Sequence, residues 1–236
     1  LVMWGSRRVG RPVKWVATRS ESFLGDTHGR DQIVSAEMAF DRDGKILGLR
    51  ADSKHAVGSH VFGAAAVTSM FSMKLAPNVY AIPTVHLVGK AILTNTAPLS
   101  PYRGAGRPEA AYLTERLIDQ AAFELEIDPS ELRRRNFIKA DMMPHRTPTG
   151  CVYDSGDFER VMDACLKLSD HQGYSARRTA SKREGRLRGR GLAYFLEEAS
   201  VFNERMEIRF DPGGTVTIIA GTHSHGQGHA TTFAQL

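Results

Sequence analysis

Residues 94–109 read TNTAPLSPYRGAGRPE, a stretch rich in proline, glycine and arginine that separates two regular segments. The apolar run over 85–93 comes before it and is typical of a β-strand. A helical pattern begins at Pro108, because proline is favoured at the first helical position, where its missing N–H costs nothing. The sequence therefore predicts a strand, a loop and a helix in succession.

The loop between this strand and this helix has the features of an anion-binding turn. Gly104 and Gly106 permit positive φ angles and let a ligand approach the backbone closely. The N–H groups and dipole of the helix start, together with Arg103 and Arg107, favour a negative charge. A tight turn with solvated arginines explains the same residues equally well. The Gly-Lys-Ser/Thr signature of a phosphate-binding P-loop is missing from this stretch.

The composition is that of an ordinary globular protein. The 236 residues suffice for one large domain or two small ones, with 42% hydrophobic residues and a net charge of +5. No apolar run is long enough to span a membrane. Cys151 and Cys165 form neither a disulfide framework nor a Cys-x-x-Cys motif, so we expect a reduced, cytoplasmic setting. Because the chain starts at Leu1 and residues 231–236 resemble a helix cut short, we expect an internal fragment.

The first part of the chain has mostly strand patterns. Strand-like alternation occurs in three segments, at 11–18, 32–40 and 45–51. The last two form a predicted hairpin, because Asp43-Gly44 is a strong turn signal, and 19–30 is expected to be a polar surface loop. Two segments stay open: 53–73 fits an irregular cofactor-facing wall or a short helix, and 78–93 fits a strand pair or one bent strand.

Helical patterns follow Pro108. Leu113, Leu117, Ala121 and Leu125 recur every four residues and predict a buried helix face, with Glu115, Asp119 and Glu124 on the solvent side. The capping box at 128–131 begins a short helix, and its Arg133-Arg134-Arg135 run is interpreted as a solvated face rather than a ligand site. A further amphipathic helix is predicted over 158–166, with Cys165 as a small core residue.

A basic segment over 173–190 is predicted to be an exposed helix end and a linker, with a subdomain boundary at 187–191. Strand patterns resume behind it, at 191–200, 204–210 and 215–220, the last two around a turn at 211–214.

A second glycine loop follows the last of these strands, at 221–235. Gly226 and Gly228 flank Gln227, which suits hydrogen bonding to a large polar ligand through the backbone and the amide. His223, His225 and His229 lie nearby, but glycines interrupt any helix, and no nearby carboxylate or cysteine completes a tetrahedral metal site. Polar contacts to an organic cofactor are therefore favoured over plain loop residues and over direct metal ligation.

Several motifs in one order connect the two loops to a known family. They are Gly10-Arg-Pro-Val-Lys-Trp15, Thr18-Arg-Ser-Glu21, Thr94-Asn-Thr96, Pro101-Tyr-Arg-Gly-Ala-Gly-Arg-Pro-Glu-Ala110, Glu115-Arg-Leu-Ile-Asp119, Asp128-Pro129, Leu132-Arg-Arg-Arg-Asn136 and Gly226-Gln-Gly-His229. With these motifs the chain resembles the molybdopterin-binding large subunit of the xanthine dehydrogenase, aldehyde oxidase and aerobic carbon monoxide dehydrogenase family. The resemblance covers nearly the whole chain.

The resemblance implies an α+β fold, with mixed sheets and packed helices, and a molybdenum–pterin cofactor in mono- or dinucleotide form. Residues 1–188 would form part of a first molybdopterin-binding subdomain, and 189–236 would begin a second. Arg103 is the implied catalytic residue, and no side chain would ligate the metal, which the pterin sulfurs hold. The implied cofactor-binding residues lie in both loops, and they are Tyr102, Gly104, Ala105, Gly106, Gly226, Gln227, Gly228 and His229.

The implied activity is the oxidative hydroxylation of an aldehyde or an N-heterocycle with water as the oxygen source. Electrons would leave to an iron–sulfur subunit and a flavin (FAD) subunit, so the resemblance implies a hetero-oligomer that binds neither nucleic acid nor membrane. Carbon monoxide dehydrogenases of the family have a copper-binding cysteine where this chain has Gly104, which disfavours carbon monoxide oxidation.

Two family elements are expected outside the sequence: a Gly-Gly-Phe-Gly stretch before Leu1 and the catalytic glutamate beyond Leu236. Glu197 and Glu198 do not match that glutamate's motif and are interpreted as strand-edge carboxylates, so the fragment alone is expected to be inactive. The alternative from another class is a non-catalytic basic module that binds a nucleotide or RNA through the glycine loops and the 173–190 segment.

Overall fold

The computed structural model describes residues 1–197, 204–224 and 226–236. The chain divides into two compact units, Leu1–Leu196 and Glu197–Leu236, and each is described by itself. Leu192, Tyr194 and Leu196 pack against the core of the first unit, which explains why this unit continues past the boundary proposed at 188/189.

A three-stranded sheet forms the base of the first unit, in the order β1-β2-β3. Its strands are β1 (Gln32–Phe40), β2 (Ile46–Gly58) and β3 (Val85–Leu93). The predicted hairpin is confirmed, since β1 pairs antiparallel with β2 across a turn that contains Gly44 at φ +78°. β3 pairs parallel with β2, and this pairing needs a crossover, which contains α3 (Ala65–Lys74).

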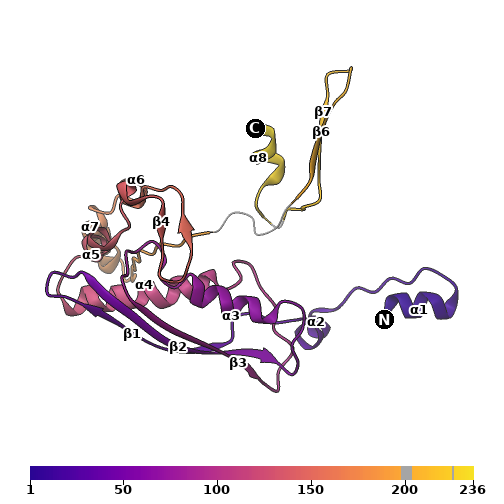
Figure 1. Ribbon diagram of the computed structural model, residues 1–236, viewed down its shortest axis with the longest axis horizontal. Coiled ribbons are helices and arrows are strands. Elements are labelled where there is room, and N and C mark those ends of the chain that lie inside the picture. Colours follow the sequence, from indigo (N-terminus) through magenta and orange to yellow (C-terminus); the bar gives the residue numbers. More distant parts are fainter. Residues whose placement is uncertain (198–203, 225) are drawn as a thin grey trace. The chain divides into compact units, whose positions relative to one another are not determined.

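Two helices cover one face of this sheet (Figure 1). α4 (Arg107–Glu124) packs against β1 and α3, and α3 packs against β2 and β3. Alternate side chains of β2 enter the layer between sheet and helices, among them the buried Leu49, Ala51 and Val57. The strand, loop and helix predicted around residues 94–109 are thereby confirmed, with β3 leading into the loop and α4 leaving it.

Shorter elements complete the first unit. They are α1 (Val2–Val9), α2 (Arg19–Gly25), α5 (Pro129–Asn136), η1 (Ala140–Met142), β4 (His145–Arg146), β5 (Val152–Tyr153), α6 (Phe158–Leu168) and α7 (Tyr174–Arg183). Aromatic rings join them to the core: Phe137 stacks on Tyr80 at 5.7 Å and meets Tyr194 edge-on at 5.2 Å. This mixture of segregated helices and small sheets confirms the α+β class.

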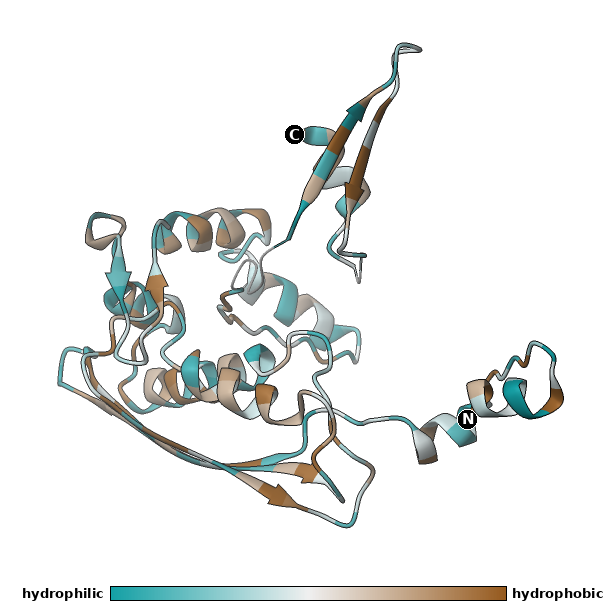
Figure 2. Cartoon of the chain, turned by 45° about the vertical axis from the view of Figure 1, so that its right-hand side comes forward, coloured by the Kyte–Doolittle hydropathy of each residue, from teal (hydrophilic) through white to brown (hydrophobic). Residues whose placement is uncertain are grey.

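The second unit contains the hairpin of β6 (Met206–Phe210) and β7 (Val216–Ala220), followed by α8 (His229–Gln235). Hydrophobic and hydrophilic residues alternate along β6, as the sequence predicts (Figure 2). In the described part of the chain, no helix is both long and apolar enough to cross a membrane.

Two strand predictions are wrong. Residues 11–18 form no strand, and 19–25 form α2 rather than a loop, because Thr18 and Glu21 make a reciprocal capping box at its start. Residues 191–197 form no strand either; residues 198–200 lie outside the described part of the chain, as does Glu198. The open segment 53–73 is divided, since β2 continues to Gly58 before α3 begins.

Four burial predictions are also wrong. Leu125, predicted on the buried helix face, is exposed because it lies at the C-terminal end of α4. Glu115 and Arg133, predicted to face solvent, are both buried and form an ion pair with each other. Cys165 is exposed rather than part of the core, although it lies on the same side of α6 as the buried Phe158 and Met162, because the burial of this face ends one turn before Cys165.

Candidate functional site

The loop between β3 and α4 has an unusual backbone. Gly104, Ala105 and Gly106 follow one another at φ +93°, +43° and +99°, all in the left-handed region. Two tight hydrogen bonds close the loop: the Ala105 N–H donates to the Tyr102 carbonyl at 2.8 Å, and the Arg107 N–H donates to the Gly104 carbonyl at 3.0 Å. Glycine adopts this region without steric cost, but Ala105 does not, so the surrounding structure has to hold Ala105 in its left-handed conformation.

Gly106 is required by packing as well as by its φ angle. A Cβ atom at this position would lie 2.4 Å from the Thr68 carbonyl oxygen and 2.8 Å from the Ser72 nitrogen, both in α3. A Cβ at Gly104 would lie 2.7 Å from the Pro108 ring. Both glycines therefore let the loop lie directly against its neighbours.

The loop side chains fall into two groups. Tyr102 and Arg103 are exposed. Arg107 is half-buried: its guanidinium lies 4.7 Å from the Phe71 ring centroid, and its Nη1 donates to the Gly104 carbonyl at 3.4 Å. Of the two arginines predicted to favour an anion, Arg103 is therefore the one whose side chain is presented to solvent.

Sequence analysis missed a contributor to this site, the segment 28–30. The His28 N–H donates to the Pro98 carbonyl at 3.0 Å, and the Ser100 N–H donates to the His28 carbonyl at 2.9 Å. Arg30 then donates from Nη2 to the Arg103 carbonyl and lies 4.8 Å over the Tyr102 ring. No local pattern signals this contact, because 73 residues separate Arg30 from Arg103.

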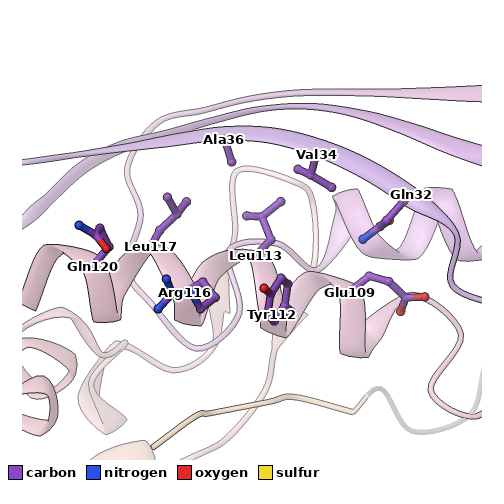
Figure 3. A pocket seen from close by; sticks show the side chains of 9 residues that line it. All are labelled: Gln32, Val34, Ala36, Glu109, Tyr112, Leu113, Arg116, Leu117 and Gln120. Carbon is purple, nitrogen blue, oxygen red and sulfur yellow. The ribbon is translucent and has the colours of Figure 1, made fainter. Parts of the chain in front are cut away.

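A groove of about 430 Å³ lies between β1 and the first turns of α4. Figure 3 shows Leu113 and Leu117 of α4 pointing toward Val34 and Ala36 of β1. At its end, the Glu109 carboxylate is buried, and neither oxygen accepts a hydrogen bond from the described residues. Arg30 Nε is 3.8 Å from Glu109 Oε1, so this groove adjoins the cation that contacts the loop.

The second glycine loop lies in the second unit and also has a left-handed backbone. Gly226 has φ +113° and Gly228 has φ +74°, and a Cβ at Gly228 would have no atom within 4 Å. The Gly228 N–H donates to Ser224 Oγ at 3.3 Å, and the His229 ring stacks on Phe233 at 5.1 Å. His225 lies outside the described residues. Three or more His, Cys, Asp or Glu side chains arranged to hold a metal ion are not found among the described residues.

The structure thus forms one turn at Tyr102–Gly106 in the first unit, where Tyr102 and Arg103 are exposed and Gly106 is buried against α3. It forms another at Gly226–His229 in the second unit, where the three residues before His229 are exposed. Each turn leads into a helix, α4 or α8.

The chain belongs to the molybdopterin cofactor-binding domain family, whose description matches residues 1–137 and again 164–236. The resemblance drawn from the motifs is confirmed at the level of the family.

The relatives are large subunits of molybdenum enzymes. The chain is 31% identical to the nicotine 6-hydroxylase large subunit of Paenarthrobacter nicotinovorans, over 100% of this chain and 31% of that protein. It is 36% identical to the carbon monoxide dehydrogenase large chain of Hydrogenophaga pseudoflava, over 97% of this chain and 31% of that protein. The chain therefore spans about a third of the length of these relatives.

A solved structure has the same fold. Quinoline 2-oxidoreductase from Pseudomonas putida 86 superimposes with a TM-score of 0.87 at 30% identity, over 99% of this chain and 32% of that chain.

The residues present fit a molybdenum–pterin cofactor. Taken by itself, the exposed guanidinium of Arg103 in the first unit suits a phosphate of such a group. Taken by itself, the exposed backbone at Gly228 in the second unit suits the hydrogen-bonding edge of a pterin. The open space around Gly228 leaves room for such a close approach.

Proposed function

We propose that the chain is part of the large subunit of a molybdenum hydroxylase that acts on an aldehyde or an aromatic N-heterocycle. In the balanced reaction, R–H and water give R–OH, two protons and two electrons. When bound, the molybdenum–pterin accepts the electron pair. The observation that carries this proposal is the left-handed turn Tyr102–Gly106, with the Arg103 side chain exposed, in a chain of the molybdopterin-binding family.

The proposal gives each turn a part in binding the cofactor. Arg103 is the catalytic residue, because it is the exposed cation of its turn, and Tyr102, Gly104, Ala105 and Gly106 shape the backbone around it. Gly226, Gln227, Gly228 and His229 bind the same cofactor from the second unit. On this assignment 1–188 and 189–236 belong to successive molybdopterin-binding subdomains. Two successive family matches, at 1–137 and 164–236, support the number of subdomains.

An N-heterocycle or aldehyde fits better than carbon monoxide as the substrate. Two relatives are named for N-heterocycles, nicotine and quinoline. The copper-binding cysteine of the carbon monoxide dehydrogenases would fall at Gly104, where φ is +93° and a Cβ would lie 2.7 Å from the Pro108 ring. Any side chain there would require the turn to move.

We extend the proposal to the assembly. Iron–sulfur and flavin partner subunits would take the two electrons onward, which agrees with relatives named as subunits or chains of larger enzymes. Cys151 and Cys165 are free thiols, as in proteins of the reducing cytoplasm. A basic RNA-binding module is less well supported, since Arg188 Nε donates to Ser181 Oγ at 2.9 Å and Arg190 stacks on Tyr174 at 4.4 Å.

The test is the composition and turnover of the whole protein, purified with its partner subunits. We expect stoichiometric molybdenum and pterin, and reduction of an artificial electron acceptor with a panel of aldehydes and N-heterocycles. Carbon monoxide should give no reduction. A purified protein without pterin that binds RNA in a salt-dependent manner would contradict the proposal and favour the basic module.

A further inference from the structure

We propose that Arg30 is a positioning residue that holds the Tyr102–Gly106 turn in its cofactor-binding conformation. This inference rests on the proposed function, because it assigns a role within the same site. Arg30 lies in the segment between α2 and β1 that sequence analysis interprets as a polar surface loop.

The guanidinium of Arg30 contacts two consecutive residues of the turn, Tyr102 and Arg103. It donates from Nη2 to the Arg103 carbonyl and lies 4.8 Å over the Tyr102 ring. The same Nη2 would be 3.9 Å from a Cβ atom at Gly104. A planar guanidinium can donate to a carbonyl and stack on an aromatic ring at the same time, which an ammonium group cannot do equally well.

Arg30 itself is held in place by the backbone on both sides. The parallel β-bridge between His28 and Leu99 joins the segment that contains Arg30 to the residues just before the Tyr102–Gly106 turn. On the other side the Ala56 N–H donates to the Asp31 carbonyl at 3.0 Å. Arg30 has φ +58°, a left-handed conformation that a residue with a Cβ keeps only where its surroundings impose it.

Glu109 keeps the guanidinium at this position from the other side. Its carboxylate is 5% exposed, lies 3.8 Å from Arg30 Nε, and accepts no hydrogen bond from the described residues. A buried carboxylate is costly unless a cation lies close to it. Since Glu109 is in the first turn of α4, Arg30 connects the segment before β1, the turn and the helix start.

These contacts stabilise the turn around Ala105, a residue with a Cβ that keeps its left-handed conformation only where its surroundings impose it. Removing Arg30 leaves the Arg103 carbonyl, the Tyr102 ring and the Glu109 carboxylate without that partner. The turn then relaxes, and the exposed Arg103 side chain loses its position. A residue of this kind changes catalysis or cofactor affinity through the groups it orients, typically by about 10–100-fold.

The experiment uses the full-length subunit with its partner subunits and compares Arg30→Ala, Arg30→Lys and Arg50→Ala. Arg50 is the matched control, since it is an arginine of the adjoining sheet that forms an exposed ion pair with Glu37 at 2.5 Å. The measurements are molybdenum and pterin content, kcat and KM, and the electron paramagnetic resonance spectrum of the molybdenum. We expect Arg30→Ala to lower kcat per molybdenum by about 10–100-fold and to alter the spectrum.

We expect Arg30→Lys to restore part of kcat, and Arg50→Ala to match the wild type. An Arg30→Ala protein with wild-type kcat and spectrum would overturn the proposal. If that variant does not accumulate, Arg30→Lys decides: a changed spectrum at full molybdenum content supports the role of Arg30, and an unchanged spectrum and kcat contradict it. Wild-type protein without pterin would instead refute the proposed function, so the two failures are distinguishable.

Discussion

Arg133 of α5 and Glu115 of α4 form an ion pair of 2.8 Å whose side chains are 0% and 6% exposed. The Tyr80 hydroxyl donates to the other carboxylate oxygen at 2.6 Å, and Arg133 Nη2 also donates to Asp119 at 2.8 Å and to the Leu192 carbonyl at 2.8 Å. Burial raises the pKa of the Glu115 carboxyl, while Arg133 beside it opposes that increase. This network joins two helices to the segments around residues 80 and 192.

Arg133→Met is therefore expected to be strongly destabilising. It leaves the Glu115 carboxylate buried without its main cation, and breaking a buried pair from one side costs about 3–5 kcal/mol. The measurement is the free energy of unfolding of the full subunit in urea. Arg135→Met is the control, because Arg135 pairs with Glu131 at the surface, where such a pair contributes about 0.5 kcal/mol. Equal losses in the free energy of unfolding for the two substitutions would contradict a stabilising role for the buried network.

Gly106→Ala is expected to disturb the cofactor turn. The new Cβ would lie 2.4 Å from the Thr68 carbonyl oxygen, so α3 or the turn must move. Gly150→Ala is the matched control: Gly150 has φ +89°, yet a Cβ there has no atom within 4 Å, so only the conformational cost of about 1–2 kcal/mol remains. We expect molybdenum content to fall in Gly106→Ala alone. Normal loading of both variants would argue against the turn as a cofactor site.

His55 gives a prediction about pH. Burial lowers the pKa of this imidazole, which lies in β2 with Nε2 2.8 Å from Ser53 Oγ. As the pH falls below about 6.5, the unfolded chain takes up a proton at His55 before the folded chain does. The free energy of unfolding therefore decreases as the pH falls from the unfolded-state pKa to the lower folded-state pKa. The decline in Tm of the full subunit between about pH 7.5 and about pH 5 should be shallower in His55→Gln than in the wild type, because histidine titrates in this range. The exposed His86→Gln is the control on the same sheet, and identical slopes in wild type and His55→Gln would refute the assignment.

Local signals were sufficient for the elements that frame the site. Asp43-Gly44 marks a hairpin because its turn requires a left-handed glycine, and Pro108 marks a helix start because of its fixed φ. Each of these signals depends on residues next to one another in the chain. The same holds for the two glycine turns, whose positive φ angles the glycines themselves suggest.

Contacts between residues far apart in the sequence could not be predicted from such local signals. The charges of Arg133 and Glu115 predict solvent exposure, and only the packing of α5 on α4 shows that they neutralise each other in the interior. Arg30 is similar, since it reaches the turn through a bridge between distant segments. The strand expected at 11–18 failed for the opposite reason: alternation alone does not supply a neighbouring strand to pair with.

The two turns lead to the last prediction. If both bind one molybdopterin, then Arg103→Ala in the full-length protein should lose activity while its Tm stays within experimental error of the wild type. The side chain is exposed, so its removal leaves no cavity and no buried charge. Gln227→Ala should lower pterin content, because it removes an amide that is able both to donate and to accept hydrogen bonds. Wild-type turnover by the Arg103→Ala variant would refute the assignment of Arg103 as a catalytic residue. An experimental structure of the loaded protein with Arg103 and Gln227 on opposite outer surfaces would refute the shared cofactor altogether, since one pterin cannot reach both.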